Sequence, residues 1–424
     1  MKATFDKQKL LAALTPAAGI SQTRNTLVSV DGLLFECPID PRFGETDGTE
    51  SGDLCRISAF DLEKGLRTTV ECEIDEPGLF VINTVKILQI IRAMPDGLVT
   101  ISIDDKCRVR ITGGQSSFDI TATPGEEFPT MPMFVGERVY TLPQYMLKKL
   151  LGQSIYAVAQ NEQRASFNGA LFRIQDGELT IVGCDGNRLA AAKCMLPPES
   201  GAADARMLIP GKFLGELSKL LRDTEDELTM MIGRKHIIFK LDSIYFFTRM
   251  LDTEYVAYEK FLPVTYRTEV YVSTDDLRSA IERASVVTED KLGGSGKPPI
   301  KLDIAADAIT LSSVSSGGSV HERVPAAIGG ASLSLGFNCR YLLDALRTVP
   351  TDCETLRIRL IDASMGIMIE PSCGTGFSHS TPDESVFGER GFDVPVEVSN
   401  EGSDENENVR SEFMSFIMPL RMNS

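Results

Sequence analysis

The chain has 424 residues, of which 42% are hydrophobic, and a formal net charge of −17 at pH 7. This length suits two to four domains with ordinary cores, and no apolar run approaches the roughly 20 residues that a membrane-spanning helix needs. The acidic balance argues against generic affinity for nucleic acid, because phosphates repel an acidic surface. Residues 372–410 hold nine acids and two Arg, so the remaining chain is only mildly acidic.

The nine cysteines and three histidines are scattered along the chain. No CxxC pair occurs, and an odd, unpaired set of thiols fits a reducing cytosol better than a disulfide framework. A structural zinc site needs about four clustered nitrogen or sulfur ligands, and none cluster here. The first residues also lack the apolar region of a signal peptide. We therefore expect a cytoplasmic protein without a metal or another cofactor.

Hydrophobic alternation and helical spacing recur three times along the chain. The first copy has a strand at 2–5, a helix from Asp6 to about Ala18, a hairpin over 27–37 and 54–72, a strand at 79–83, a helix ending at Arg92, and strands at 98–103, 107–112 and 116–124. The second has a strand at 138–143, a helix at 144–159, a hairpin over 169–194 with a tight turn at Asp176-Gly177, a strand at 207–210, a helix ending at Arg222, and strands at 227–232, 236–241 and 244–251. The third has a strand at 268–273, a helix at 275–287, strands within 300–326 and at 333–338, a helix ending at Arg347, and strands at 355–360 and 366–371.

The copies follow one another at about 125–130 residues, which is too long for a solenoid repeat of roughly 20–50 residues. The pattern predicts the α+β class, with three homologous domains at 1–134, 135–258 and 259–424. Each domain would pack two helices on an antiparallel sheet. Residues 372–410 have the composition of a disordered or loosely folded insertion before the last strand of the third domain.

The predicted helices carry basic side chains although the protein is acidic. In the first helix of each copy these are Lys7, Lys9, Lys148, Lys149, Arg278 and Arg283, and in the second helix they are Lys86, Arg92, Lys212, Lys219, Arg222, Arg340 and Arg347. We expect the acids of the same helices mainly in the first turns, where the helix dipole favours them. Either these cations only solvate exposed faces, or they form a basic lining that meets phosphates without reading base edges.

Two stretches invite an enzymatic interpretation that their residues do not support. In GGSGKPP, at 293–299, the first Gly of a phosphate loop is missing and Pro298 stands where Ser or Thr is required. Asp185, in GCDGNR, is more typical of a turn at a strand end than of a catalytic acid. No Ser/His/Asp or Cys/His set stands out, so we expect no catalytic residues and no enzymatic activity.

Four stretches carry a resemblance to a known family: TLPQYMLKKLL, NGALFRIQDGELTIVGCDGNRLA, LGFNCRYLLDALRTV and FIMPLRM. With the three repeats in order, the chain resembles the bacterial DNA polymerase III beta subunits, or sliding clamps. The resemblance implies a non-catalytic processivity factor, a head-to-tail homodimer that closes into a six-domain ring around duplex DNA. It implies as partners double-stranded DNA without sequence preference, the polymerase III alpha subunit, the clamp loader delta subunit, and other polymerases and repair proteins with clamp-binding motifs, but no membrane.

The resemblance also implies two DNA contacts outside the helices. Arg24, in SQTRNTLVSV, matches a loop near the DNA in the family's ring, and Arg164 lies on the loop after the first helix of the second domain. In the family this second loop commonly carries aromatic side chains that touch single-stranded DNA. Ala165 and Ser166 replace them here, so this sequence lacks the side chains for that contact.

A pocket for short partner peptides is implied at the junction of the second and third domains. Its walls would be Phe167, Cys184, Gly186, Asn187, Arg188, Leu189, Val256, Lys260, Phe261, Asn338, Tyr341, Phe416, Met418, Pro419, Leu420 and Arg421. Apolar and thioether side chains with a few polar anchors suit short linear motifs bound in a groove. By strand alternation, Phe416 and Met418 could instead face the core. The family's usual Gly-Arg-Phe-Pro-Asp-Tyr-like run is replaced by DTEYVAYEK at 252–260, which predicts a reshaped pocket floor near Val256.

The resemblance implies a contact between the first domain of one copy and the third domain of another. Lys86, Phe118 and Ile120 would meet Val286 and Val287, an apolar patch with charged surroundings such as a reversible interface needs. We expect the acidic insertion to lie beside the pocket and adjust partner access, unless it is an inert loop. The insertion, the altered junction and the missing aromatics leave open an alternative, an accessory clamp paralogue that binds partners as a scaffold without productive ring loading.

Overall fold

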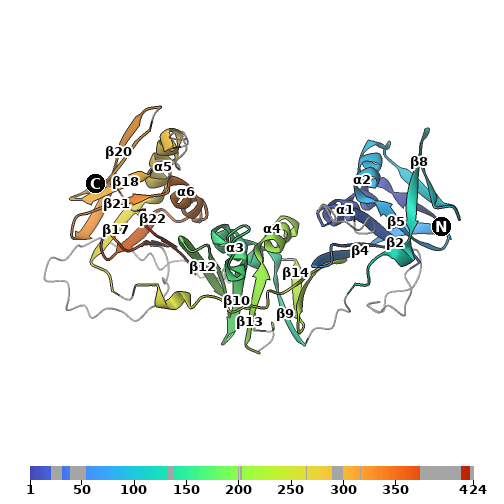
Figure 1. The fold of residues 1–424 in the computed structure, drawn as a ribbon, viewed down its shortest axis with the longest axis horizontal. Helices are drawn as coiled ribbons and strands as arrows, with labels where there is room; N and C mark the ends of the chain where they lie inside the picture. The colour runs from blue at the N-terminus through green and yellow to red at the C-terminus, as the bar shows by residue number, and fades with distance from the viewer. Residues whose placement is uncertain are drawn as a thin grey trace, which may run out of the picture. The chain divides into compact units, whose positions relative to one another are not determined.

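The structure, a computed structural model, describes residues 1–20, 31–38, 54–131, 137–198, 200, 203–263, 265–288, 299–315, 317–372 and 412–420. The chain forms two compact units, one from residues 1–147, 197–201 and 213–250 and the other from 148–196, 202–212 and 251–424. The order strand, helix, four strands, helix, three strands occurs three times along the chain (Figure 1). The predicted α+β repeat is therefore confirmed. The first repeat lies in the first unit, the third in the second unit, and the second repeat contributes to both.

The elements have the following bounds. The first repeat comprises β1 Lys2–Asp6, α1 Lys7–Ala18, β2 Gly32–Cys37, β3 Leu54–Phe60, β4 Lys64–Glu76, β5 Gly78–Asn83, α2 Thr84–Ala93, β6 Leu98–Ile103, β7 Arg108–Gly113 and β8 Ser116–Pro124. The second comprises β9 Arg138–Pro143, α3 Gln144–Ser154, β10 Gly169–Gln175, β11 Glu178–Cys184, β12 Arg188–Met195, β13 Ala205–Pro210, α4 Gly211–Leu220, β14 Glu227–Ile232, β15 His236–Leu241 and β16 Ile244–Arg249. The third comprises β17 Thr268–Ser273, α5 Thr274–Thr288, β18 Ile300–Ala305, β19 Ala308–Val314, β20 Ser319–Gly330, β21 Leu333–Phe337, α6 Cys339–Arg347, β22 Thr355–Leu360, β23 Ile367–Pro371 and β24 Glu412–Ile417.

Local sequence explains where several helices begin. The Asp6 carboxylate accepts hydrogen bonds from the backbone N–H groups of Gln8 and Lys9, at 2.9 and 3.0 Å, and so caps α1. Asn83 and Asn338 cap α2 and α6 in the same way. Each cap satisfies backbone donors that have no partner within the first helical turn.

The tight turn predicted between β10 and β11 is confirmed. Asp176 has a φ of 52° and Gly177 a φ of 77°, the pair of positive values that a type I′ hairpin turn requires. The helix predicted at 144–159 ends earlier, because α3 stops at Ser154 and the chain continues as the 3-10 turn Ile155–Ala157. The apolar residues after Ser154 pack on β11 and β12, so their spacing reflects contact with the sheet and not further α-helix.

Each unit is built on one antiparallel sheet of twelve strands that crosses a junction between repeats. The order is β1-β6-β7-β8-β5-β2-β3-β4-β16-β15-β14-β9 in the first unit and β13-β10-β11-β12-β24-β23-β22-β17-β20-β19-β18-β21 in the second. The junction pairs are β4 with β16, where Lys64 lies opposite Thr248, and β12 with β24, where Arg188 lies opposite Ile417. β24 also pairs with β23 and completes the third repeat, as predicted.

Helices pack beside one another on these sheets. In the first unit α1 contacts α2 and the strands β3 and β4, and in the second unit α5 contacts α6, β19 and β20 (Figure 1). Phe213 of α4 stacks on Phe246 of β16 with ring centroids 4.1 Å apart, which joins helix and sheet at the first junction. None of the helices in the described ranges is both long enough and apolar enough to cross a membrane.

Candidate functional site

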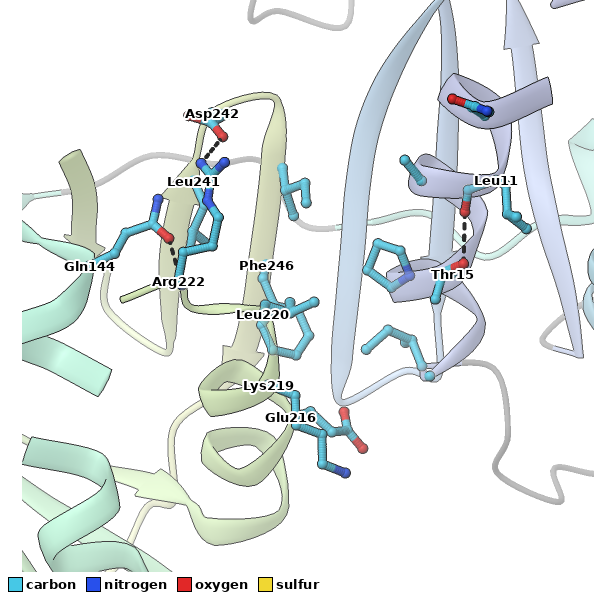
Figure 2. Close-up of a pocket in the computed structure, with 16 residues that line it drawn as sticks. Leu11, Thr15, Gln144, Glu216, Lys219, Leu220, Arg222, Leu241, Asp242 and Phe246 are labelled. Carbon is cyan, nitrogen blue, oxygen red and sulfur yellow. Dashed lines mark hydrogen bonds and ion pairs between the residues drawn. The ribbon is translucent and has the colours of Figure 1, made fainter. Parts of the chain in front are cut away.

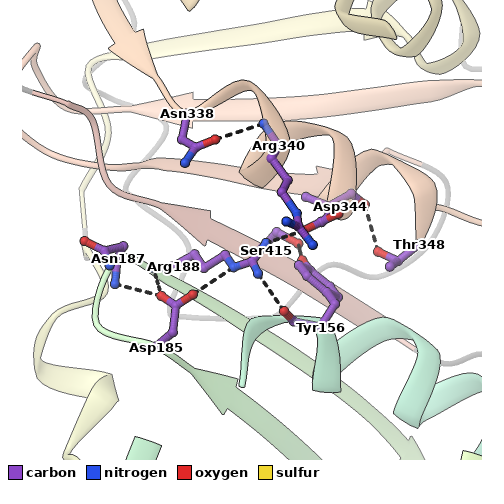
Figure 3. A network of polar contacts seen from close by, with 10 residues as sticks. Tyr156, Asp185, Asn187, Arg188, Asn338, Arg340, Asp344, Thr348 and Ser415 are labelled. Carbon is purple, nitrogen blue, oxygen red and sulfur yellow. Dashed lines mark hydrogen bonds and ion pairs between the residues drawn. The ribbon is translucent and has the colours of Figure 1, made fainter. Parts of the chain in front are cut away.

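The junction between β12 and β24 holds a charged network around Arg188 (Figure 3). The guanidinium donates hydrogen bonds to Asp185 Oδ2 at 3.0 Å, to Asp344 Oδ2 at 2.7 Å and to the Tyr156 carbonyl oxygen at 2.8 Å. It also lies over the Tyr341 ring, 4.4 Å from the ring centroid. Only 11% of the Arg188 side chain is exposed. The cation predicted to face a partner peptide is therefore also a structural part of the junction.

The turn before β12 orients this arginine. Asp185 Oδ1 accepts hydrogen bonds from the N–H groups of Asn187 and Arg188, at 2.9 and 3.0 Å, and Gly186 has a φ of +88°. The interpretation of Asp185 as a turn residue is confirmed. Burial alone would lower the pKa of Arg188, but the carboxylates of Asp344 and Asp185 outweigh it and raise that pKa. The guanidinium is therefore held in its charged form.

Five predicted pocket residues meet in one hydrophobic cluster of the second unit. Phe167, Cys184, Leu189 and Phe416 are buried in it, and Val256 packs against them. Phe416 thus faces the core, as the alternative interpretation of this strand held. Burial raises the pKa of the Cys184 thiol.

The cluster also contains side chains that were not predicted as pocket residues. Tyr255, Tyr258 and Leu262 are buried in it, and the Tyr255 hydroxyl donates to the Val182 carbonyl oxygen at 3.0 Å. Burial raises the pKa of Tyr258 to about 12 and also raises the pKa of Tyr255. The two tyrosines of DTEYVAYEK were the available sequence signal for burial. Aromatic side chains bury large areas in protein cores, and a buried tyrosine hydroxyl usually finds a hydrogen-bond partner. In this chain the altered run at 252–260 therefore contributes Tyr255 and Tyr258 to the hydrophobic core.

Other predicted pocket residues lie at the surface of the same unit. Phe261, Met418 and Leu420 are 64%, 38% and 41% exposed. The Met418 N–H donates to the Asn187 carbonyl oxygen at 2.9 Å, so Met418 lies beside the 185–188 turn and does not face the core. Gly186, Asn187 and Lys260 are exposed, and Pro419 is half-buried.

Asn338 and Arg421 are the remaining polar residues predicted for the pocket. The Asn338 side chain accepts a hydrogen bond from the Arg340 N–H at 3.0 Å, which engages it as the cap of α6. Arg421 lies outside the described residues, as does the predicted insertion between Cys373 and Val409. The pocket itself therefore stays a prediction, with its apolar base and part of its rim described.

About half of the predicted DNA-facing cations make ion pairs within the chain. Lys7 is the most engaged: its side chain is 13% exposed, and its Nζ lies 2.6 Å from the Met94 carbonyl oxygen and 3.0 Å from Asp96. Met94 is the C-cap of α2, where backbone carbonyls attract a cation. Lys7 is therefore largely buried and already paired within the chain, and its predicted contact with DNA stays a prediction.

The acids that pair with the helical cations come mainly from outside the first helical turns. The pairs are Lys9 with Glu71, Arg222 with Asp226 and Asp242, Arg278 with Asp275, Arg283 with Glu322, Arg340 with Asp344, and Arg347 with Glu282. Only Asp275 stands in the first turn of its helix. Among the acids of the helices themselves, Asp6 caps α1 and Asp275 and Asp276 lie in the first turn of α5, whereas Glu216, Glu282 and Asp344 lie further along their helices, so the expectation holds for only half of them.

A second group of predicted cations, equal in number, makes no ion pair with any residue in the described ranges. Its members are Lys86, Arg92, Lys148, Lys149, Arg164, Lys212 and Lys219. Lys212 donates to the Asn161 side chain at 2.9 Å, and Arg164 lies 6.0 Å from the centroid of the Phe167 ring. Arg24 lies outside the described residues. This group is the part of the predicted lining with charge left for phosphates.

A groove of about 920 Å³ lies in the first unit, where the helices α1 and α4 approach β16 (Figure 2). Leu11, Leu220 and Phe246 line its apolar part. At its polar end Arg222 is held by Asp242 at 2.5 Å, and the Gln144 side chain accepts the Arg222 N–H at 3.0 Å. The groove therefore fixes one predicted DNA-facing cation beside its neighbouring carboxylate.

The residues predicted for the contact between subunits are partly exposed. Val286, at the end of α5, is 73% exposed, and Phe118, on β8, is 38% exposed. Lys86 is exposed, whereas Ile120 and Val287 are half-buried. No group of three or more His, Cys, Asp or Glu suited to a metal ion occurs in the described parts of the chain.

Three copies of one α+β domain, joined by sheets that continue through the junctions, define the fold of a three-domain clamp subunit. Models of the N-terminal, central and C-terminal domains of the DNA polymerase III beta subunit match residues 1–132, 141–256 and 259–381 in order. The chain belongs to the DNA polymerase III beta subunit family.

Similar proteins carry names that agree with this family. A curated relative named beta sliding clamp from Bacillus subtilis is 27% identical over 354 residues, which cover 82% of this chain and 90% of that one. The protein of the same name from Salmonella typhimurium is 27% identical over 374 residues, which cover 87% of this chain and 96% of that one. Solved structures of the Bacillus subtilis DNA polymerase sliding clamp and the Thermotoga maritima DNA polymerase III beta subunit align over 100% of both chains, with TM-scores of 0.83 and 0.79 at 23% and 22% identity.

Proposed function

We propose that this chain is a DNA sliding clamp, a non-catalytic processivity factor. Two copies would close head to tail into a six-domain ring that encircles duplex DNA without sequence preference. The ring would tether the polymerase III alpha subunit, the clamp loader delta subunit, and other polymerases and repair proteins through short peptides. We place the protein in the cytoplasm and its domain boundaries at 134/135 and 258/259.

The observation that carries the ring is the repetition of one junction inside the chain. β4 of the first repeat pairs with β16 of the second, and β12 of the second repeat pairs with β24 of the third. By position in the repeat, β20 of the third copy corresponds to β4 and β12, and β8 of the first copy corresponds to β16 and β24. Pairing β20 of one molecule with β8 of another continues the same rule. Because such a contact is heterologous, it closes only when the rotation completes a ring.

The exposed apolar side chains near these two strands support the same contact. Phe118 lies on β8, and Val286 lies on α5, which packs on β20. Both are exposed in a single chain, and an interface would remove them from water. Ile120, Val287 and Lys86 would complete the contact.

The sparse unpaired cations support weak binding to DNA. With a net charge of −17, the protein as a whole repels phosphate, so topological linkage and not affinity would retain it on DNA. Lys86, Arg92, Lys148, Lys149, Arg164 and Lys212 would contact phosphates and carry no base-specific information. Contacts of this kind permit sliding.

The buried cluster around Phe167 and Phe416 supports the peptide pocket, because it gives an apolar base beside exposed Met418, Leu420 and Phe261. We place the acidic insertion beside this pocket. Deleting Cys373–Val409 and titrating a clamp-binding peptide tests that position, and an unchanged affinity would remove the proposed effect on access.

Loading onto nicked circular DNA by the cognate clamp loader tests the ring. The isolated complex is then cut to linear form. Retention on circles with loss from cut DNA is the expected result, whereas retention on both forms would mean ordinary contact binding and would overturn the proposal. Absence from both forms, with peptide binding kept, would favour the accessory scaffold that the altered junction at 252–260 and Ala165 and Ser166 suggest.

A further inference from the structure

The two junctions inside the chain share one turn and one ion pair. Asp61 and Asp185 each follow a strand of their sheet, and each side chain accepts the backbone N–H groups two and three residues later. The third residue after each is a cation, Lys64 or Arg188, whose side chain is 14% or 11% exposed. Both junctions therefore present a half-buried positive charge at the same point.

The cation reaches the same helical position of the next repeat in both cases. Lys64 Nζ lies 2.5 Å from Glu216 Oε2, and Arg188 Nη1 lies 2.7 Å from Asp344 Oδ2. Glu216 and Asp344 are each the sixth residue of the second helix of their repeat, α4 and α6. The ion pair therefore recurs at the same structural position in both junctions, although the residues that form it differ.

The third copy of this turn has the same backbone but no charge. Ser315 follows β19 as Asp61 follows β3, and its N–H donates to the Gly318 carbonyl oxygen at 2.8 Å, as the N–H of Asp61 does to Lys64 at 3.0 Å. The Ser315 hydroxyl accepts the Gly317 N–H at 3.1 Å, in place of the carboxylate. Gly318 thus occupies the position of Lys64 and Arg188. The sixth residue of α2, which would face this turn across two copies of the chain, is Gln89.

We propose that the interface between two copies of this chain uses the same turn and helix position as the two internal junctions but lacks their ion pair, so that Gly318 of one copy and Gln89 of the other lie opposite each other across it. This inference rests on the proposed head-to-tail ring. At the two internal junctions the pair is shielded from water, so loss of one partner would leave the other charge half-buried and uncompensated. A Gly and a Gln in its place leave the interface to apolar contacts and backbone pairing, which form again without re-pairing charges.

The turn has room for the missing side chain. A Cβ on Gly318 would meet no atom within 4 Å. The φ of Gly318 is +157°, so a substitution there carries some backbone strain. Lys86 lies three residues before Gln89 on the same helix, where an introduced acid could also reach it. A double-mutant cycle removes both effects, since each is present in the corresponding single variant.

The experiment restores the ion pair at the interface. Gly318→Arg, Gln89→Glu and the double variant are compared with the unchanged protein by sedimentation, which gives the dimer dissociation constant, and by the half-life of loaded protein on nicked circles. We expect the dimer dissociation constant of the double variant to be about three to ten times lower than the product of the two single-variant effects predicts. This factor is the range for a partly shielded ion pair. Effects that simply multiply would overturn the inference.

A reversed pair, Gly318→Glu with Gln89→Arg, guards against misfolding of the first set, with thermal unfolding as the check. The same coupling is expected from it, and no coupling in a folded reversed pair also overturns the inference. Failure of the ring is distinguishable from failure of this inference. An unchanged protein that stays monomeric at all concentrations would refute the proposed dimer, whereas a dimer without coupling would refute only the role of Gly318 and Gln89.

Discussion

Arg188 and Asp344 meet at 2.7 Å between the turn before β12 and the middle of α6, two segments from different repeats. Asp185 holds the same guanidinium from the other side at 3.0 Å, and Tyr341 covers its face. With 11% of the arginine side chain and 21% of the aspartate side chain exposed, the pair is largely shielded from solvent. The pair therefore contributes to the junction as a structural contact, whatever a partner peptide adds.

Replacing Arg188 with Ala should destabilise the protein by about 2–4 kcal/mol, because the half-buried carboxylates of Asp185 and Asp344 would lose the cation that neutralises both. Urea unfolding followed by circular dichroism measures the change. The matched control is Arg234→Ala, since Arg234 pairs with Glu137 but is 89% exposed, and its loss should change stability by less than about 1 kcal/mol. Equal effects of the two substitutions would show that the network has no special role.

Gly186 adopts a φ of +88°, and a Cβ there would meet only the Phe167 ring at an ordinary 3.6 Å. Gly186→Ala should therefore destabilise the protein by about 1 kcal/mol through backbone strain alone. Gly152→Ala is the control in the opposite direction. Gly152 lies within α3 with open space around it, so alanine should stabilise by about 0.5–1 kcal/mol. Thermal unfolding of both variants distinguishes these signs.

The repeat could be predicted from the sequence because alternation, helical spacing and caps are local. Asp6 and the Asp176-Gly177 turn each specify a conformation with neighbouring residues only. The pairing of β4 with β16 and of β12 with β24 joins residues far apart in the chain, and no local pattern encodes it. For the same reason the ion pairs of Arg188 and Lys7 could not be predicted from the sequence. Arg188 was predicted only as a pocket residue, and the partners of Lys7, Met94 and Asp96, lie almost ninety residues away.

Tyrosine ionisation should destabilise the second unit at high pH. Burial raises the pKa of Tyr156 and Tyr258 to about 12, and also raises that of Tyr255, while an unfolded tyrosine has a pKa near 10. Because the folded state holds these protons more tightly, the stabilisation is full below about pH 10 and is lost as pH rises towards 12. Unfolding and absorbance at 295 nm, recorded together against pH, should show a fraction of the tyrosines ionising only as the protein unfolds.

Tyr258→Phe should make the alkaline loss of stability shallower, because one proton fewer is released on unfolding. The slope of the unfolding free energy should fall by up to about 1.4 kcal/mol per pH unit between pH 10 and 12. An unchanged slope would mean that Tyr258 ionises normally in the folded protein.

Phe416 and Met418 should separate stability from partner binding. Phe416 is 5% exposed within the cluster, so Phe416→Ala should cost about 3–5 kcal/mol of stability. Met418 is 38% exposed, so Met418→Ala should change stability by less than about 1 kcal/mol while weakening a clamp-binding peptide several-fold. Peptide titration by calorimetry, beside urea unfolding, measures both. Normal peptide affinity in Met418→Ala would remove Met418 from the pocket.

The salt dependence of DNA binding should come from the cations without carboxylate partners. Arg92 and Lys149 are exposed and make no ion pair within the described ranges, so each can release about one counterion on meeting a phosphate. The variant Arg92→Ala with Lys149→Ala should lower the slope of log K against log salt by up to about 1.8. Its matched control is Lys9→Ala with Arg283→Ala, which removes the same charge from residues that pair with Glu71 and Glu322. Fluorescence anisotropy with a short duplex at several salt concentrations gives both slopes. The control should change the slope by less than half as much, because its cations already have protein partners; equal changes would mean that net charge alone, and not the unpaired cations, governs contact with DNA.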